Sequence, residues 1–148
     1  MSRYTKCDRV FKLTPSLTKE QVEYLSAFSR ERHCLRNEEY LSQNLPNEKV
    51  RAEVGLPVGK DGMYCVYGSQ FVNFSEHMSD EAVIDLNRKA RECPELYCSW
   101  LSTEDGNYLY WIDGEMSRCV EDWLIFIESH FFSVWGIKMK ESNEKIKV

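Results

Sequence analysis

A turn between two apolar segments constrains the fold of this chain more than any other feature. Residues 103–107, Thr-Glu-Asp-Gly-Asn, connect the apolar segment 96–102 with the aromatic residues that follow. Asp is common in tight turns, and Gly supplies the positive φ that a three-residue hairpin connection needs. We therefore predict an antiparallel β-hairpin with Glu104 and Asp105 at its exposed tip. A loop tip gives a carboxyl group neither burial nor a fixed partner, so this pair is not predicted to be catalytic.

This turn also predicts the strand register, and the register predicts which side chains share a face. Trp100 is then opposite Tyr110, and Leu101 is opposite Leu109. Both faces of the hairpin become apolar, whereas a sheet with one hydrated face alternates apolar and polar residues. Unless residues 33–62 cover it, one face is an exposed patch of the kind that marks an interface, and a two-fold homodimer is the simplest way to bury it. The candidate partner-binding face consists of Tyr97, Leu101, Leu109 and Trp111.

The aromatic residues also permit a second kind of site. Aromatic walls with few polar groups suit a nucleotide base or a similar ring. A small-molecule pocket, or an active site built on one, would be lined by Tyr64, Tyr67, Trp100, Tyr108 and Tyr110.

The remaining segments predict one α+β domain over residues 1–148. Thr18 and Gln21 have the spacing of a capping box, which predicts the start of a helix that ends near residue 32. We expect a mostly antiparallel sheet with the two main helices packed on one face and a C-terminal β-hairpin. The other predicted elements are strands over 7–14 and 63–68, a loop with short helical turns over 33–62, a short helix over 80–90, and a long helix over 117–135 that ends at Gly136.

The sequence carries no motif that indicates an enzyme or a metal site. Residues 55–62 resemble a phosphate loop only superficially, because Asp61 follows the lysine where a hydroxyl residue is required. The three histidines lie outside the catalytic signatures, and none of the six cysteines is spaced as Cys-x-x-Cys. We therefore predict reduced thiols, no catalytic residue, no cofactor and no metal.

The charge pattern bears on nucleic-acid binding. The net charge is −5, and an acidic middle lies between more basic ends. This argues against broad nucleic-acid binding, which requires a contiguous basic face. Binding through the predicted C-terminal hairpin remains an alternative, although lysines on an edge strand also prevent unwanted strand pairing. The lysines of that hairpin are Lys138, Lys140, Lys145 and Lys147.

The location is predicted from hydropathy. No apolar run approaches the ~20 residues that span a bilayer, and the first residues lack the apolar region of a secretory signal. We expect the protein in the cytoplasm.

Several segments together resemble a group of small uncharacterised proteins encoded by bacteriophages and prophages. They are GLPVGKDG, VIDLNR, LYCSW, TEDGNYLYWIDGE and WLIFIESHFFSVWGI, in this order, and the resemblance covers about residues 10–137. It implies a phage or mobile-element origin and action in a bacterial cell, and it carries over no catalytic residue. The leading hypothesis is a non-enzymatic interaction protein that inhibits a host or anti-phage defence factor, as anti-CRISPR proteins do.

Overall fold

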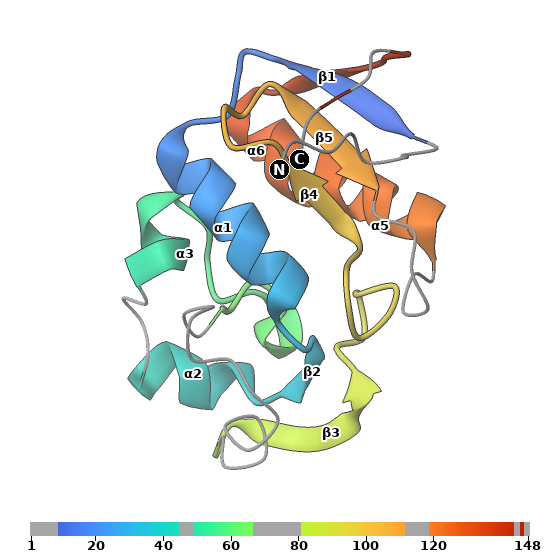
Figure 1. Ribbon diagram of the computed structural model, residues 1–148. Coiled ribbons are helices and arrows are strands. Elements are labelled where there is room, and N and C mark those ends of the chain that lie inside the picture. Colours follow the sequence, from blue (N-terminus) through green and yellow to red (C-terminus); the bar gives the residue numbers. More distant parts are fainter. Residues whose placement is uncertain (1–8, 45–48, 67–80, 112–118, 144–145, 147–148) are drawn as a thin grey trace, which may run out of the picture.

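The computed structural model describes residues 9–44, 49–66, 81–111, 119–143 and 146 (Figure 1). Within them, the main sheet has four strands, and the first strand of the chain lies inside it rather than at an edge. The strand order is β4 (Trp100–Ser102), β5 (Tyr108–Trp111), β1 (Val10–Thr14) and β6 (Lys138–Glu141), and all neighbours are antiparallel. The expected α+β class with a mostly antiparallel sheet is confirmed.

The first helix, α1 (Lys19–Arg30), begins where the sequence predicts. The Thr18 hydroxyl accepts a hydrogen bond from the backbone N–H of Gln21 at 3.2 Å, and the Gln21 side chain accepts one from the Thr18 N–H at 2.9 Å. This reciprocal pair satisfies two of the donors that a helix N-terminus otherwise leaves open. The predicted capping box is therefore confirmed.

The second main helical segment contains a turn that the sequence pattern does not predict. It runs as α5 (Val120–Ile127), the π-helical turn η3 (Glu128–Phe132) and α6 (Ser133–Trp135). Gly136 follows with a φ of 72°, so it is the left-handed residue after the helix, as expected. Residues 117 and 118 of the predicted helix lie outside the described residues.

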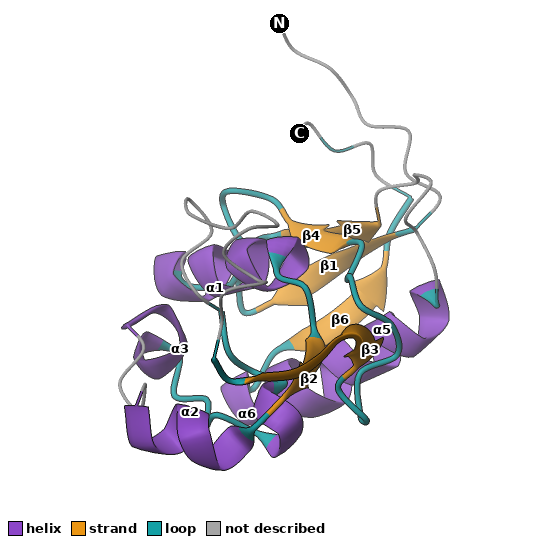
Figure 2. Ribbon diagram, turned by 90° about the horizontal axis from the view of Figure 1, so that it is seen from below, coloured by secondary structure: helices purple, strands orange, loops and turns teal. Residues whose placement is uncertain are grey.

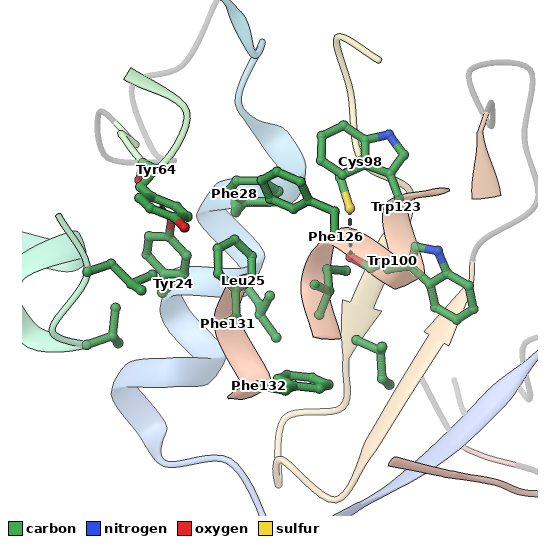
Figure 3. Packing of buried hydrophobic residues seen from close by; sticks show 14 of the residues in the cluster. Tyr24, Leu25, Phe28, Tyr64, Cys98, Trp100, Trp123, Phe126, Phe131 and Phe132 are labelled. Atoms are coloured by element: carbon green, nitrogen blue, oxygen red, sulfur yellow. Dashed lines mark hydrogen bonds between the residues drawn. The ribbon is translucent and has the colours of Figure 1, made fainter. Parts of the chain in front are cut away.

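Both main helices pack on the same face of the four-stranded sheet, and Trp100 forms hydrogen bonds with both of them. Its ring is fully buried, and its indole N–H donates to the carbonyl of Val120 in α5 at 2.9 Å. The backbone carbonyl of Trp100 accepts a hydrogen bond from the Ser29 hydroxyl of α1 at 2.5 Å. Figure 3 shows the aromatic side chains of both helices gathered beside Trp100 in the main hydrophobic core. Because a buried indole N–H needs an acceptor, this arrangement specifies how α5 meets the sheet.

A smaller layer of short elements completes the fold (Figure 2). Strand β2 (Cys34–Arg36) pairs with β3 (Val83–Lys89) in a two-stranded antiparallel sheet. Between them in sequence lie α2 (Glu38–Asn44), α3 (Lys49–Glu53) and the 3-10 turn η1 (Lys60–Gly62). The short helical turns expected over 33–62 are present, whereas β2 is not predicted by the sequence.

Two predicted elements are wrong in the described residues. The helix expected over 80–90 is strand β3, because its β-branched start pairs with β2. The strand expected over 63–68 is not formed by Met63–Val66, which are buried but not in strand conformation, and residues 67–68 lie outside the described residues. A short apolar run indicates burial, but its periodicity alone does not distinguish a strand from other buried structure.

The C-terminal hairpin is described only in its first half. Strand β6 corresponds to the predicted first strand, and it pairs with β1. Residues 144–145 and 147–148 lie outside the described residues, so the return strand stays a prediction. No helix in the described ranges is long and apolar enough to cross a membrane.

Candidate functional site

The hairpin register differs by one residue from the predicted register. Trp100 is opposite Trp111, and Leu101 is opposite Tyr110. The connection is longer because Thr103 N–H donates to the carbonyl of Tyr108 at 2.9 Å, which leaves four residues at the tip instead of three. A shift of one residue in one strand reassigns its side chains to the other face.

The predicted partner-binding face is therefore not a single surface. Leu109 is fully buried in the main core, and Trp111 packs against that core. Leu101 lies on the opposite face of the sheet. Tyr97 precedes β4, where the Arg32 guanidinium carbon lies 5.7 Å from the centre of its ring. The prediction that these four residues share one face is wrong.

A surplus apolar face nevertheless exists, with different members. We call the sheet face that points away from the two main helices the outer face. Its apolar residues form a small cluster separate from the main core, in which Val10, Tyr110 and Ile146 are buried and Leu101 and Tyr108 are partly buried. The hairpin thus has two apolar faces, as expected, but the observed register distributes the residues between these faces differently from the predicted register.

The five aromatic residues predicted to line a pocket are also distributed over separate places. Tyr64 and Trp100 are buried in the main core, whereas Tyr108 and Tyr110 belong to the outer face. Tyr67 lies outside the described residues. The Tyr64 carbonyl accepts a hydrogen bond from the Tyr24 hydroxyl at 2.7 Å, and burial raises the pKa of the Tyr64 phenol. These contacts are those of a packed core residue.

The predicted lysine face is partly described. Lys138 and Lys140 are exposed on β6, and Lys145 and Lys147 lie outside the described residues. The pairing of β6 with β1 adds a third lysine, because Lys12 lies directly opposite Lys140. The sequence does not predict that Lys12 lies beside Lys140, because strands so far apart in the chain carry no local pattern that indicates their pairing.

The carboxyl pair lies at the exposed hairpin tip, as the sequence predicts, but Asp105 has fixed hydrogen-bond partners there, contrary to the expectation from the sequence. Glu104 and Asp105 are exposed. The Asp105 carboxylate accepts hydrogen bonds from the Thr103 hydroxyl at 2.6 Å and the Asn107 N–H at 2.9 Å. These bonds, led by that from Thr103, lower the pKa of Asp105, so at neutral pH it is a charged turn residue rather than a proton donor.

The residue that distinguishes the glycine-rich segment from a phosphate loop has a structural partner. Asp61 is buried in a left-handed conformation with a φ of 58°. Its two carboxylate oxygens accept bonds of 2.9 Å from the Arg91 guanidinium, and one also accepts from the Arg91 N–H at 3.1 Å. The hydrogen bond from the Arg91 side chain is the largest cause of the lowered pKa of Asp61. The Asp61–Arg91 pair therefore holds the glycine-rich segment against the residues that follow β3.

The histidines do not form a catalytic arrangement in the described residues. His33 is buried, with its Nε2 atom 2.7 Å from the Phe28 carbonyl oxygen. The ring of His130 stacks on Phe126 with 4.0 Å between centroids, and its Nδ1 atom lies 3.0 Å from the Ser129 hydroxyl. His77 lies outside the described residues. Within the described ranges, no group of three or more His, Cys, Asp or Glu side chains could hold a metal ion.

Most of the exposed large apolar side chains lie on the last helical segment, a feature that the expected helix over 117–135 does not by itself predict. Among the described residues, Ile84, Ile125 and Val134 are the large hydrophobic residues that remain exposed. Two of them belong to α5 and α6. The outer face and the exposed side of this segment are therefore the two candidate interaction surfaces.

Comparison with known proteins finds no matching family model, no matching curated protein and no matching solved structure.

Proposed function

We propose that this protein is a non-enzymatic interaction protein that binds a partner protein through the exposed side of the segment formed by α5, η3 and α6. The observation that carries this proposal is the exposure of Ile125 and Val134, which are 60% and 61% accessible. The other sides of the same segment are packed in the core. Covering apolar side chains that are exposed to water on an otherwise well-packed helix is favourable, because it removes apolar surface from water.

The polar residues of this surface favour burial against a partner. Ser129 lies between the two apolar residues in sequence, and its hydroxyl donates to the carbonyl of Ile125 at 2.8 Å. The Ser133 hydroxyl donates to the carbonyl of Ser129 at 2.5 Å. Because both hydroxyl protons are already bonded within the helix, covering them with a partner leaves no donor unsatisfied.

The charge of the surface indicates the chemistry of the partner. Asp122 and Glu128 are exposed on the same segment, as is Glu121, which already forms an ion pair with Arg9. A partner groove with an apolar floor and a basic rim would complement it, which is the helix-in-groove mode of recognition. The sequence resemblance to phage and prophage proteins supports a bacterial host or anti-phage defence protein as this partner, and inhibition as the outcome.

The test is recovery of a stoichiometric partner from bacterial lysate at physiological salt with the tagged protein. The variant Ile125→Ser/Val134→Ser is expected to lose the partner and to keep its thermal stability, because exposed substitutions usually change stability by less than about 0.5 kcal/mol. Ile84→Ser is the matched control, since Ile84 is 61% exposed but lies on β3. Equal recovery with the double variant, or failure to recover any partner with the unchanged protein, would contradict the proposal.

A further inference from the structure

The outer face of the four-stranded sheet carries a second site on the side of the sheet opposite the last helix. We infer that this face binds single-stranded nucleic acid, with Lys12, Lys138 and Lys140 contacting phosphates and the Tyr108 ring stacking on a base. This inference goes beyond the proposed function and uses none of the residues on which that function depends.

Strand pairing brings these residues together. Lys12 is flanked by Tyr108 on β5 and by Lys140 on β6. Lys138 lies opposite Thr14, two residues from Lys140 and therefore on the same face. The alternate residues of these strands, including Leu13 and Met139, belong to the main core, so the lysines point to the other side. The result is a row of one aromatic ring and two ammonium groups, with a third ammonium group beside it.

The charges of this row are not compensated within the described residues. Lys12, Lys138 and Lys140 are exposed, and none of them forms an ion pair with a described residue. Like charges placed directly across a strand pair repel each other, at Cβ separations of about 5 Å. An edge strand explains a lysine that blocks pairing, but Lys12 is on β1, which has a strand on each side. A bound polyanion would remove this repulsion.

The form of the surface favours unpaired strands over duplex. A sheet face offers no helix or ribbon that could enter a major groove. Unpaired bases stack on exposed aromatic rings while lysines follow the backbone, and this is the usual arrangement for single-strand recognition on a sheet. Tyr108 is only partly buried beside Lys12, so both contacts are within reach of one nucleotide chain.

The net charge of −5 does not by itself oppose local binding. Among the described residues, the exposed acidic side chain on the strands of the main sheet is Glu141, which alternates with Lys140 along β6 and pairs with Arg9 at 3.3 Å. The other exposed acidic residues of the described chain lie on the helices, including Glu20 on α1 and Glu38 on α2, at the hairpin tip or in loops. The lysines of the outer face are on strands. Surface charges separated by more than about 10 Å are largely screened at 0.1 M salt.

Fluorescence anisotropy with a labelled oligothymidylate of about 20 nucleotides tests the inference, since known single-strand sites take about 4–16 nucleotides. We expect binding at low salt, with log K falling linearly against log salt. Three phosphate contacts to a single strand predict that replacing the three lysines reduces this slope by about 2. The variant is Lys12→Gln/Lys138→Gln/Lys140→Gln. The control, Lys19→Gln/Arg30→Gln/Lys60→Gln, removes the same charge from exposed positions elsewhere and is expected to leave affinity nearly unchanged.

Replacement of the ring separates stacking from charge. Tyr108→Leu is expected to weaken oligothymidylate binding about 5- to 150-fold without changing the salt slope, because stacking contributes about 1–3 kcal/mol per base. Tyr108→Phe keeps the ring and should bind like the unchanged protein. Circular dichroism establishes that each variant is folded.

The inference is overturned if the oligothymidylate does not bind at low salt, or if both triple variants lose affinity equally. Tighter binding of a duplex of the same sequence would also overturn it. The last comparison uses polyglutamate of matched charge. If polyglutamate binds as tightly as the oligothymidylate, and Tyr108→Leu has no effect on binding, the face recognises acidic proteins instead. Because Ile125 and Val134 play no part in these measurements, their outcome is independent of the proposed protein interaction.

Discussion

Gly106 allows the hairpin tip to pack closely against Leu17, which precedes α1. Its φ is +75°, and a Cβ atom placed there would lie 2.5 Å from the carbonyl oxygen of Leu17. The same approach allows the Leu17 N–H to donate to the Gly106 carbonyl at 2.9 Å. Glycine is therefore needed for two reasons, the left-handed backbone and the closeness of the segment before α1.

Gly106→Ala should destabilise the protein more than a turn argument alone predicts. The left-handed conformation costs an alanine about 1–2 kcal/mol, and the clash with Leu17 adds about 1–3 kcal/mol. Gly55→Ala is the matched control, because Gly55 has a φ of +73° but a Cβ atom at that position would meet nothing within 4 Å. Chemical denaturation of the two variants measures the difference. Equal losses of unfolding free energy would show that the contact with Leu17 does not constrain the hairpin.

The hairpin shows, for whole elements, why register determines function. One extra residue in the connection places Leu109 and Trp111 with the main core and leaves Leu101 and Tyr108 on the outer face. Asp105 and the Thr103 hydroxyl stabilise this longer connection through side-chain bonds within the loop. The composition of each face of the hairpin therefore depends on a few hydrogen bonds in one turn.

Substitution of two leucines tests this register. Leu109→Ala is expected to cost about 2–5 kcal/mol of unfolding free energy, because a fully buried side chain leaves a cavity. Leu101→Ala should cost less than about 2 kcal/mol, because that side chain is only partly buried. In the register predicted from the turn, the two leucines face each other across the strands and should respond alike. Urea denaturation that gives equal costs would support that register over the one described.

The whole molecule separates its chemistry by surface. Many exposed acidic side chains lie on the helices, and the described lysines of the main sheet lie on its outer face. The described cysteine thiols are divided between the interior and the surface. Cys34, Cys65, Cys93 and Cys98 are buried, whereas Cys119 is exposed. Burial raises the pKa of both Cys93 and Cys98 to about 12, so their reactive thiolate forms are scarce at neutral pH.

Thiol labelling reports the integrity of this core. In a Cys7→Ser background, which removes the cysteine outside the described residues, one thiol should react rapidly with an aromatic disulfide reagent. The other four should react only as the protein opens, and all five together in denaturant. Cys119→Ser should abolish the fast phase. A second fast thiol at neutral pH would mean that part of the core opens locally.

Local sequence signals are sufficient for the parts of this fold whose physical cause is local. The capping box of Thr18 and Gln21, the left-handed Gly136 after the last helix, and the exposed carboxyl groups of the tip each follow from the chemistry of a few adjacent residues. The α+β class follows from the order of such segments.

Features that depend on partners distant in sequence are decided by folding itself. Strand β3 forms because β2 is beside it, and Lys12 meets Lys140 because β1 lies between β5 and β6. Side-chain periodicity cannot specify such pairings, since a strand exposes the same alternation to any neighbour, and the residues of the outer face follow from them.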